Sequence, residues 1–168
     1  PKGAALGLET DFRPHFFEGV ATVCCKLFTQ SQADFAIFGE KDYQQLCVVR
    51  QMVRDLDLAI EIIGLETVRE ADGLAMSSRN RYLTPEDRKT APLLHRTIVD
   101  AAAKVRAGGA VDAAEKAAAA TLETAGFKVD YVAVRDAETL ARWEPKSNRP
   151  CRVLAAAWLG KTRLIDNV

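Results

Sequence analysis

A strand, a helix and a second strand follow one another between residues 35 and 64, and this unit constrains the fold more than any other stretch. The apolar run 35–38 is typical of a buried strand, a glycine follows it, and the segment 42–56 carries apolar residues at helical spacing. Residues 59–64, with three isoleucines, predict a second buried strand. Because a strand–helix–strand unit pairs its two strands in parallel, we predict an α/β fold with an open parallel sheet.

Charged residues lie at the corner where the first strand meets the helix. The corner consists of Gly39, Glu40, Lys41 and Asp42. The carboxyl end of a strand and the unpaired N–H groups of a helix start both favour an anion such as phosphate, and Lys41 adds a positive charge. The simpler interpretation is a capped helix, in which Asp42 is the N-cap and Gln45 completes a capping box. The two interpretations are compatible, since one helix turn can be capped and still face a ligand.

Composition is that of an ordinary globular protein and disfavours several classes of partner. The 168 residues are 48% hydrophobic and 27% charged, and their formal net charge is zero. We therefore expect no nucleic-acid partner and no membrane partner; no apolar run approaches the ~20 residues of a membrane span. The four cysteines form neither a C-x-x-C pair nor a zinc spacing. We predict free thiols, no metal site built from protein ligands, and a cytoplasmic location.

The chain predicts two regions of different character. Residues 1–66 predict the carboxy-terminal part of a Rossmann-like parallel-sheet domain, with a helix over 16–30 whose apolar face holds Val20, Val23, Cys24 and Leu27. Residues 67–168 predict a smaller α+β domain that begins with a polar loop over 69–81. A helix with one apolar face, capped at Thr84 and stopping at Gly108, and a helix over 112–125 follow. An antiparallel sheet is predicted from an alternating strand near 127–133 and strands near 153–159 and 163–166, the last two joined by a two-residue turn at Gly160. The first strand comes late and the chain starts without methionine, so we expect a piece of a longer protein.

The polar loop carries the tetrapeptide Met76-Ser77-Ser78-Arg79. Two hydroxyls and a guanidinium on a loop can wrap a triphosphate and follow its charge as pyrophosphate leaves. Surface loops without such a role contain the same residue types often, so the tetrapeptide alone is a weak signal. Its position after a strand–helix–strand unit with Lys41 at the corner favours a nucleotide site.

Three motifs in this order resemble the pantothenate synthetase (pantoate–β-alanine ligase) family. They are FGEKDYQQL at 38–46, TVREADGLAMSSRN at 67–80, and LAAAWLG at 154–160 followed by RLIDN at 163–167. The resemblance covers essentially the whole chain and implies a Rossmann-like ATP-binding domain followed by a smaller domain that closes over the site. It also implies the family's reaction. ATP, with Mg2+, adenylates the carboxylate of pantoate, and β-alanine then attacks the adenylate to give pantothenate (vitamin B5), a precursor of coenzyme A.

The resemblance also implies roles for individual residues. The ATP site would be lined by Gly39, Glu40, Lys41 and Asp42, and by Val68 through its backbone. The counterpart of the KMSKS loop of class I aminoacyl-tRNA synthetases would be Met76, Ser77, Ser78 and Arg79. The catalytic residues would be Lys41, Ser77, Ser78 and Arg79, and Gln45 would hydrogen-bond pantoate.

The chain departs from the family pattern in two places. The family's His-x-Gly-His motif and a pantoate-binding glutamine are absent from these 168 residues, so we expect the chain to be inactive by itself. The family also reads Arg-Pro-x-His-Phe-x-Gly-Val, whereas this chain has Phe16 in place of that histidine and His15 one position earlier. The other histidine, His95, follows the polar loop and is expected at the surface.

The residues leave two other functions open. One is a non-catalytic nucleotide-binding or interaction module that keeps Lys41 and the Ser77–Arg79 segment. The other is a different adenylate-forming ligase on the same scaffold, for which Gln45 would set the substrate. For the full-length enzyme the resemblance implies a homodimer.

Overall fold

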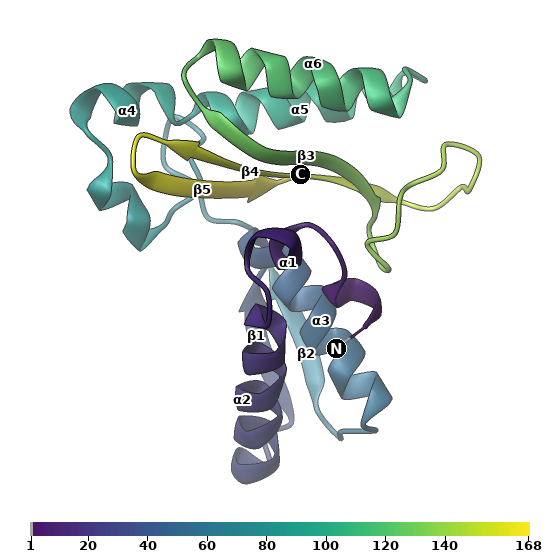
Figure 1. Cartoon of the computed structure of the whole chain (residues 1–168). Helices are drawn as coiled ribbons and strands as arrows, with labels where there is room; N and C mark the ends of the chain where they lie inside the picture. Colours follow the sequence, from purple (N-terminus) through teal and green to yellow (C-terminus); the bar gives the residue numbers. More distant parts are fainter. Residues whose placement is uncertain (1) are drawn as a thin grey trace. The chain divides into compact units, whose positions relative to one another are not determined.

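The computed structural model describes residues 2–168, which divide into two compact units. Unit 1 extends to Glu66 and includes the segment 138–141, and unit 2 comprises 67–137 and 142–168. Unit 1 contains a parallel two-stranded sheet and unit 2 an antiparallel three-stranded sheet, each with helices (Figure 1). The predicted fold class, a parallel α/β part followed by an α+β part with an antiparallel sheet, is confirmed.

Unit 1 is built around its two parallel strands. Its elements are η1 (Gly3–Ala5), α1 (Glu9–Phe12), α2 (Phe16–Ser31), β1 (Phe35–Gly39), η2 (Glu40–Asp42), α3 (Tyr43–Asp55) and β2 (Glu61–Leu65). β1 and β2 pair in parallel, with Phe35 opposite Glu61 and Gly39 opposite Leu65. Because η2 and α3 connect the two strands, the predicted strand–helix–strand unit is present.

Only one side of β1 is packed. Cys24, Val49 and Met52 form a buried cluster of α2 and α3 side chains, and Phe38 of β1 packs against it. Phe35, by contrast, is 56% exposed, and Ile37 of the same strand face is 55% exposed. Successive side chains of a strand point to opposite faces. The prediction of a fully buried strand is therefore wrong for the face that carries Phe35.

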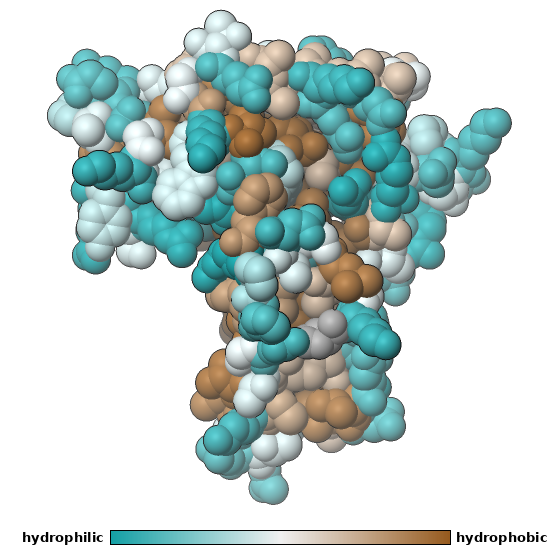
Figure 2. Space-filling view, in the orientation of Figure 1, coloured by the Kyte–Doolittle hydropathy of each residue, from teal (hydrophilic) through white to brown (hydrophobic). Residues whose placement is uncertain are grey.

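The buried side of α2 is also rotated from the prediction. Phe17 and Cys24, seven residues apart, are the buried residues of this helix. Val23 and Leu27 were predicted on the apolar face and are exposed. Figure 2 shows hydrophobic residues at the surface of the part that Figure 1 labels α2 and α3. Unit 1 therefore presents apolar side chains that its own elements do not cover.

Unit 2 places two helices over one face of its sheet. Its elements are η3 (Ser78–Tyr82), α4 (Pro85–Thr90), α5 (Leu93–Arg106), α6 (Val111–Thr124), β3 (Lys128–Asp136), β4 (Cys151–Leu159) and β5 (Thr162–Asn167). The strand order is β3-β4-β5, all antiparallel. The hairpin between β4 and β5 turns at Gly160, whose φ of +54° is in the left-handed region that favours glycine. The predicted two-residue turn is confirmed.

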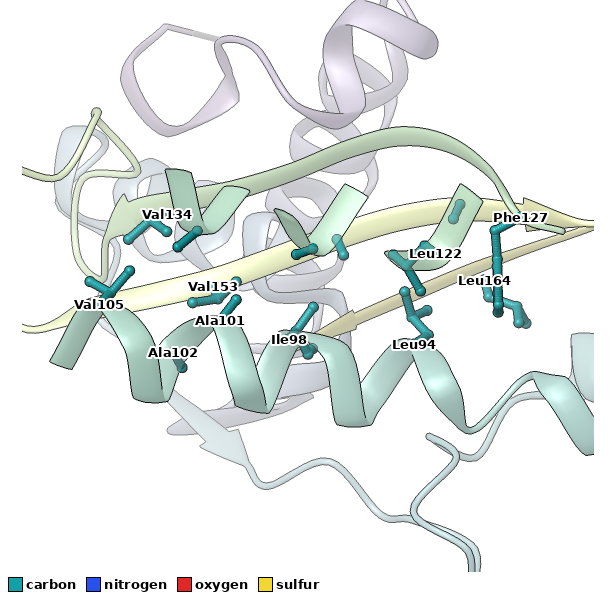
Figure 3. Close-up of a cluster of buried hydrophobic side chains, with 14 of the residues drawn as sticks. Leu94, Ile98, Ala101, Ala102, Val105, Leu122, Phe127, Val134, Val153 and Leu164 are labelled. Carbon is teal, nitrogen blue, oxygen red and sulfur yellow. The ribbon is translucent and has the colours of Figure 1, made fainter. Parts of the chain in front are cut away.

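The core of unit 2 lies between these helices and the sheet. Leu94 and Ile98 of α5 and Leu122 of α6 are almost fully buried, and they meet Val153 of β4 and Leu164 of β5 (Figure 3). The predicted apolar face of the helix after the loop is therefore confirmed. A Leu or Ile side chain buried to this extent contributes about 1.5–3 kcal/mol relative to an exposed one, so this layer holds the unit together.

Two details of unit 2 differ from the prediction. The single helix expected after Thr84 is two helices, α4 and α5, with Pro92 at the junction; proline lacks the N–H that a continuous helix needs. The alternation expected along β3 is interrupted by a register shift between Val129 and Tyr131. An extra residue of this kind moves the following side chains to the opposite face, which is why Val132 packs against the core.

Candidate nucleotide-binding site

The predicted corner of unit 1 forms as expected from the backbone pattern. β1 ends at Gly39, a single 3-10 turn holds Glu40, Lys41 and Asp42, and α3 begins at Tyr43. The Lys41 side chain is 19% exposed and its Nζ lies 3.9 Å from a carboxylate oxygen of Asp42. The strand end, the helix start and the ammonium group are therefore consecutive in one turn.

The two glycines of this corner have different surroundings. A Cβ added to Gly39 would have no atom within 4 Å, although the backbone there, with φ −71°, does not require glycine. A Cβ on Gly64 would lie 3.1 Å from Arg50 Nη2 and 3.2 Å from Glu40 Oε1. Glu40 and Arg50 therefore both lie against the end of β2. The corner has room above Gly39 and is closely packed beside Gly64.

The predicted capping box is wrong. Among the residues described, the side chain of Asp42 makes no cap hydrogen bond to the start of α3. Its backbone, with φ −94° and ψ +58°, belongs to the preceding 3-10 turn. Asp42 instead lies beside Lys41, and its side chain is 53% exposed.

The two glutamines of the motif have different environments. Gln44 is buried, where its Oε1 accepts from Glu9 N at 3.0 Å and its Nε2 donates to Ala4 O at 3.0 Å and Gly7 O at 3.2 Å. Gln45 is half-buried. Gln44 thus fastens the amino-terminal segment to α3, and Gln45 is the glutamine whose amide can serve a ligand.

His15 is not held in the interior of unit 1. It has a φ of +65° immediately before α2, and its exposed ring lies 3.0 Å from a carboxylate oxygen of Glu18. Phe16, which occupies the position of the family's histidine, lies under the guanidinium of Arg13 at 3.7 Å from the ring centre. Phe16 thus forms an apolar and cation–π contact in place of an imidazole.

In unit 2 the predicted loop is an ordered hairpin, here called the 68–76 hairpin. Arg69 and Ala75 form an antiparallel bridge, Met76 N donates to Val68 O at 2.9 Å, and Gly73 N donates to Glu70 O at 2.9 Å across the turn. Val68 and Met76, eight residues apart in sequence, are therefore neighbours. Their side chains are 67% and 54% exposed.

The predicted phosphate-binding segment continues directly from this hairpin. Ser77 Oγ accepts from Arg79 N at 3.2 Å and caps η3. Asn80 attaches this segment to the 68–76 hairpin, because its Nδ2 donates to Ala75 O at 3.1 Å and to Glu70 Oε1 at 3.2 Å. Ser78 and Arg79 are exposed. The structure thus brings Val68, Met76, Ser77, Ser78 and Arg79 together at one end of a hairpin.

Charged side chains that the sequence analysis did not single out hold the hairpin to unit 2. Arg69 makes a bidentate pair with Asp166 of β5, with distances of 2.6 and 2.9 Å. Arg88 of α4 pairs with Asp72 at 2.5 Å and with Glu70 at 3.1 Å. The Arg88 hydrogen bond lowers the pKa of Asp72, and the same contact raises the pKa of Arg88. The only sequence signal was the alternation of acids and arginines in a loop of otherwise irregular pattern.

His95 belongs to the same cluster and is not the surface residue that the sequence predicted. It is half-buried on α5, and its Nδ1 lies 3.4 Å from Asp166 Oδ2 without a hydrogen-bond partner of good geometry among the residues described. Burial lowers the pKa of His95, the charge of Arg69 lowers it further, and Asp166 opposes both effects. A Cβ on Gly73 would lie 3.2 Å from the His95 ring, so the turn of the hairpin packs on this histidine.

No group of three or more His, Cys, Asp or Glu residues that could hold a metal ion occurs within residues 2–168. The four cysteines are free thiols, and Cys24 and Cys47 are buried. None of the helices in the described part of the chain is long and apolar enough to cross a membrane.

Comparison with known proteins identifies the family. A profile of the family described as Pantoate-beta-alanine ligase matches residues 1–168. The chain belongs to this family. Pantothenate synthetase 2 of Bradyrhizobium diazoefficiens is 60% identical over 169 residues, which cover 100% of this chain and 60% of the relative. The pantothenate synthetase of Mesorhizobium japonicum is 59% identical, over 99% of this chain and 58% of the relative.

Solved structures of this ligase family have the same fold. Pantothenate synthetase from Thermus thermophilus is 46% identical and superposes with a TM-score of 0.88, over 98% of this chain and 59% of that one. Pantoate-beta-alanine ligase from Francisella tularensis, complexed with Beta-gamma ATP and Beta-alanine, is 29% identical with a TM-score of 0.75, over 100% of this chain and 56% of that one. The chain spans about 60% of the length of the curated relatives it matches.

Within this chain, the motif residues form two groups. Gly39, Glu40, Lys41, Asp42 and Gln45 lie on unit 1, and the group from Val68 to Arg79 lies on unit 2. Each group is assembled by its own unit. That the two groups meet on one nucleotide remains a prediction.

Proposed function

We propose that this chain forms part of an enzyme that ligates pantoate and β-alanine with ATP, through a pantoyl adenylate. A carboxylate oxygen of pantoate attacks the α-phosphorus of ATP, and the bond to pyrophosphate breaks. The amine of β-alanine then attacks the acyl carbon, AMP leaves, and the amine proton is released. The family match over all 168 residues is the observation that carries this proposal.

The charged groups of the chain would act on the phosphates. Lys41, at the end of β1, and Arg79, after the 68–76 hairpin, would offset the negative charge that gathers as pyrophosphate leaves. Ser77 and Ser78 would donate hydrogen bonds to phosphate oxygens. The open backbone at Gly39 supports close approach of a ligand, because nothing lies within 4 Å of a Cβ there.

The remaining motif residues would orient the two substrates. Val68 would meet adenine through its backbone, with Met76 beside it, and Gln45 would offer a donor and an acceptor to the hydroxy acid without adding charge. Glu40 and Asp42 would border the ribose and phosphates. Mg2+ would arrive with the nucleotide, since Mg2+ is commonly held by phosphates, waters and one or two carboxylates, which requires no cluster of protein ligands. We further propose a cytoplasmic homodimer for the full-length enzyme.

The test uses a joined enzyme, in which the amino-terminal part of the Bradyrhizobium relative precedes residue 1 of this chain. Pantoate-dependent ATP–pyrophosphate exchange measures adenylation. We expect Lys41→Ala and Arg79→Ala each to slow adenylation at least about tenfold, on the order of 1.4 kcal/mol. The control is Lys161→Ala, at an exposed lysine of the β4–β5 turn, which should leave the rate unchanged.

Two results would overturn the proposal. Full single-turnover rates in Lys41→Ala or Arg79→Ala would remove that residue from the mechanism. Exchange that depends on another hydroxy acid, with pantoate inert, would indicate a different adenylate-forming ligase.

We expect Gln45→Ala to raise the KM for pantoate about tenfold and to leave the KM for ATP unchanged, which corresponds to about 1.4 kcal/mol of uniform binding.

A further inference from the structure

The ion pair between Arg69 and the buried carboxylate of Asp166 attaches the 68–76 hairpin to the rest of unit 2. Arg69 is 21% exposed and Asp166 only 2% exposed on their side chains. Asp166 receives both guanidinium nitrogens of Arg69, and its Oδ1 also accepts from Asn167 N at 2.8 Å. A bidentate pair of this kind fixes direction as well as distance. Asp166 is therefore a rigid acceptor, positioned by the backbone of β5.

Arg69 joins three parts of the structure at once. Its Nη1 also donates to Gly73 O at 3.1 Å, in the turn of its own hairpin, and its Nη2 reaches Asn167 O at 3.4 Å. One guanidinium thus closes the hairpin internally and fastens it to the end of β5. The turn rests on the ring of His95 through Gly73. Removal of the guanidinium would release both attachments together.

The attachment of Arg88 is of a different kind. Its pairs with Glu70 and Asp72 involve side chains that are about one-third or more exposed. Exposed pairs contribute little and are weakened by salt, whereas a buried carboxylate that loses its paired cation is strongly unfavourable. Of the ion pairs that hold the hairpin, the Arg69–Asp166 pair is therefore expected to contribute most.

We propose that Arg69 is a positioning residue for ligation: through Asp166 it holds the 68–76 hairpin so that Val68 and Met76 are presented to the adenine and Ser77–Arg79 to the phosphates. This rests on the proposed function for the assignment of those residues to ATP. The guanidinium of Arg69 is engaged by Asp166, Gly73 and Asn167, so Arg69 would act on the nucleotide through the hairpin. Without the Arg69–Asp166 pair, a smaller fraction of molecules has the hairpin in the conformation that binds ATP. The apparent affinity for ATP falls in proportion to that fraction.

The first test needs no nucleotide. Amide hydrogen exchange, resolved by NMR, is compared between the native chain and Arg69→Lys, which keeps the charge but loses the bidentate geometry. We expect exchange at Glu70 N–H and Met76 N–H, which close the hairpin on Leu74 O and Val68 O, to accelerate at least tenfold. Asp166→Asn should do the same, and it replaces Arg69→Lys if that variant does not fold.

The matched control is Arg163→Lys. Arg163 pairs with Asp130 at 2.7 Å, and their side chains are 8% and 6% exposed, so this is a second buried arginine–aspartate pair of the same sheet, between β5 and β3. Its partner Asp130 lies on β3, outside the 68–76 hairpin. We expect exchange at Glu70 and Met76 to stay within twofold of native in this variant, which separates positioning from general loss of stability.

The second test separates positioning from chemistry in the joined enzyme. Arg69→Lys should raise the KM for ATP at least fivefold with kcat within twofold of native, whereas Arg79→Ala should lower kcat at least tenfold. Unchanged exchange at Glu70 and Met76 in Arg69→Lys would overturn the proposal, as would an unchanged KM for ATP alongside faster exchange. Native kinetics in Arg79→Ala would remove Arg79 from the proposed mechanism, and exchange with another hydroxy acid in place of pantoate would refute the proposed function. Neither result bears on how Arg69 holds the hairpin, which the hydrogen-exchange test measures.

Discussion

The two units of this chain bury their apolar side chains to different degrees. In unit 2, α5 and α6 cover one face of the sheet, and their leucines, isoleucines and valines meet those of β4 and β5. In unit 1, only one face of β1 is packed, and apolar side chains of α2, β1 and β2 remain exposed. Parallel sheets are nearly always covered on both faces, so unit 1 leaves exposed an apolar sheet face of the kind that is normally covered.

The difference extends to the residues proposed for function. In unit 1 the exposed apolar side chains lie on the faces of α2, β1 and β2, whereas the candidate site residues lie at the corner after β1. In unit 2 the exposed Val68 and Met76 lie next to each other at the end of the 68–76 hairpin opposite its turn, beside Ser77 and Arg79. An apolar pair beside hydroxyls and a guanidinium suits a ligand with a flat base and a charged tail, such as ATP. At Val68 and Met76, exposure of apolar side chains therefore coincides with a candidate site.

The largest effect expected from this comparison comes from one substitution made in each unit. Leu122→Ala in the core of unit 2 should cost about 3 kcal/mol of unfolding free energy, because it leaves a cavity among residues that cannot collapse into it. Leu27→Ala on the exposed side of α2 should cost less than about 0.5 kcal/mol. Urea denaturation measures both, by circular dichroism and by the fluorescence of Trp143 and Trp158, which lie in unit 2. Equal losses would show that Leu27 is covered in solution.

A second contrast lies within the motif of unit 1. Gln44→Ala should cost about 2 kcal/mol, since it leaves the buried Glu9 N–H without its acceptor and removes two further hydrogen bonds. Gln45→Ala should stay within about 0.5 kcal/mol of native. Urea denaturation followed by circular dichroism gives both values. A costly Gln45→Ala would mean that this amide is committed to the fold and is not available to a substrate.

The sequence predicted elements where local chemistry decides the structure. The strand–helix–strand unit, the cap at Thr84 and the turn at Gly160 follow from short patterns that act within a few residues. The burial of β1 could not be predicted, because an apolar run does not reveal how many faces of its sheet are covered. The break at Pro92 could have been predicted, since proline interrupts the hydrogen bonding of a helix.

The site was predictable to a similar extent. Lys41 and the Ser77–Arg79 segment could be singled out from charge and position, but the partners that hold the hairpin could not. Arg69 and Asp166 are ninety-seven residues apart, and no local pattern connects them. Gln44 and Gln45 are adjacent and chemically identical, and only the path of the amino-terminal segment makes one of them structural.

A smaller effect on stability is expected at the starts of two helices, α4 in unit 2 and α3 in unit 1. Thr84 Oγ1 accepts from Asp87 N at 3.1 Å at the start of α4, so Thr84→Ala should cost about 1 kcal/mol. Asp42 precedes α3 without a cap hydrogen bond among the described residues, so Asp42→Ala should change stability by less than about 0.5 kcal/mol. Thermal and urea unfolding test the pair. If Asp42→Ala were the costlier substitution, the capping box predicted from the sequence would form in solution.

The smallest effect concerns the pH dependence of stability and His95. Burial and Arg69 lower the pKa of His95 below its ordinary value of 6.5, and Asp166 opposes them. The unfolded chain therefore binds the proton more readily than the folded chain, and stability rises with pH wherever that is so. This contribution is complete above pH 6.5 and is lost as pH falls through the lowered pKa of the folded state. His95→Gln should flatten the pH dependence of the urea midpoint between pH 5 and 7, roughly the range over which histidine titrates. A steeper acid loss in His95→Gln would mean that the charged imidazole, paired with Asp166, is the form that stabilises the hairpin.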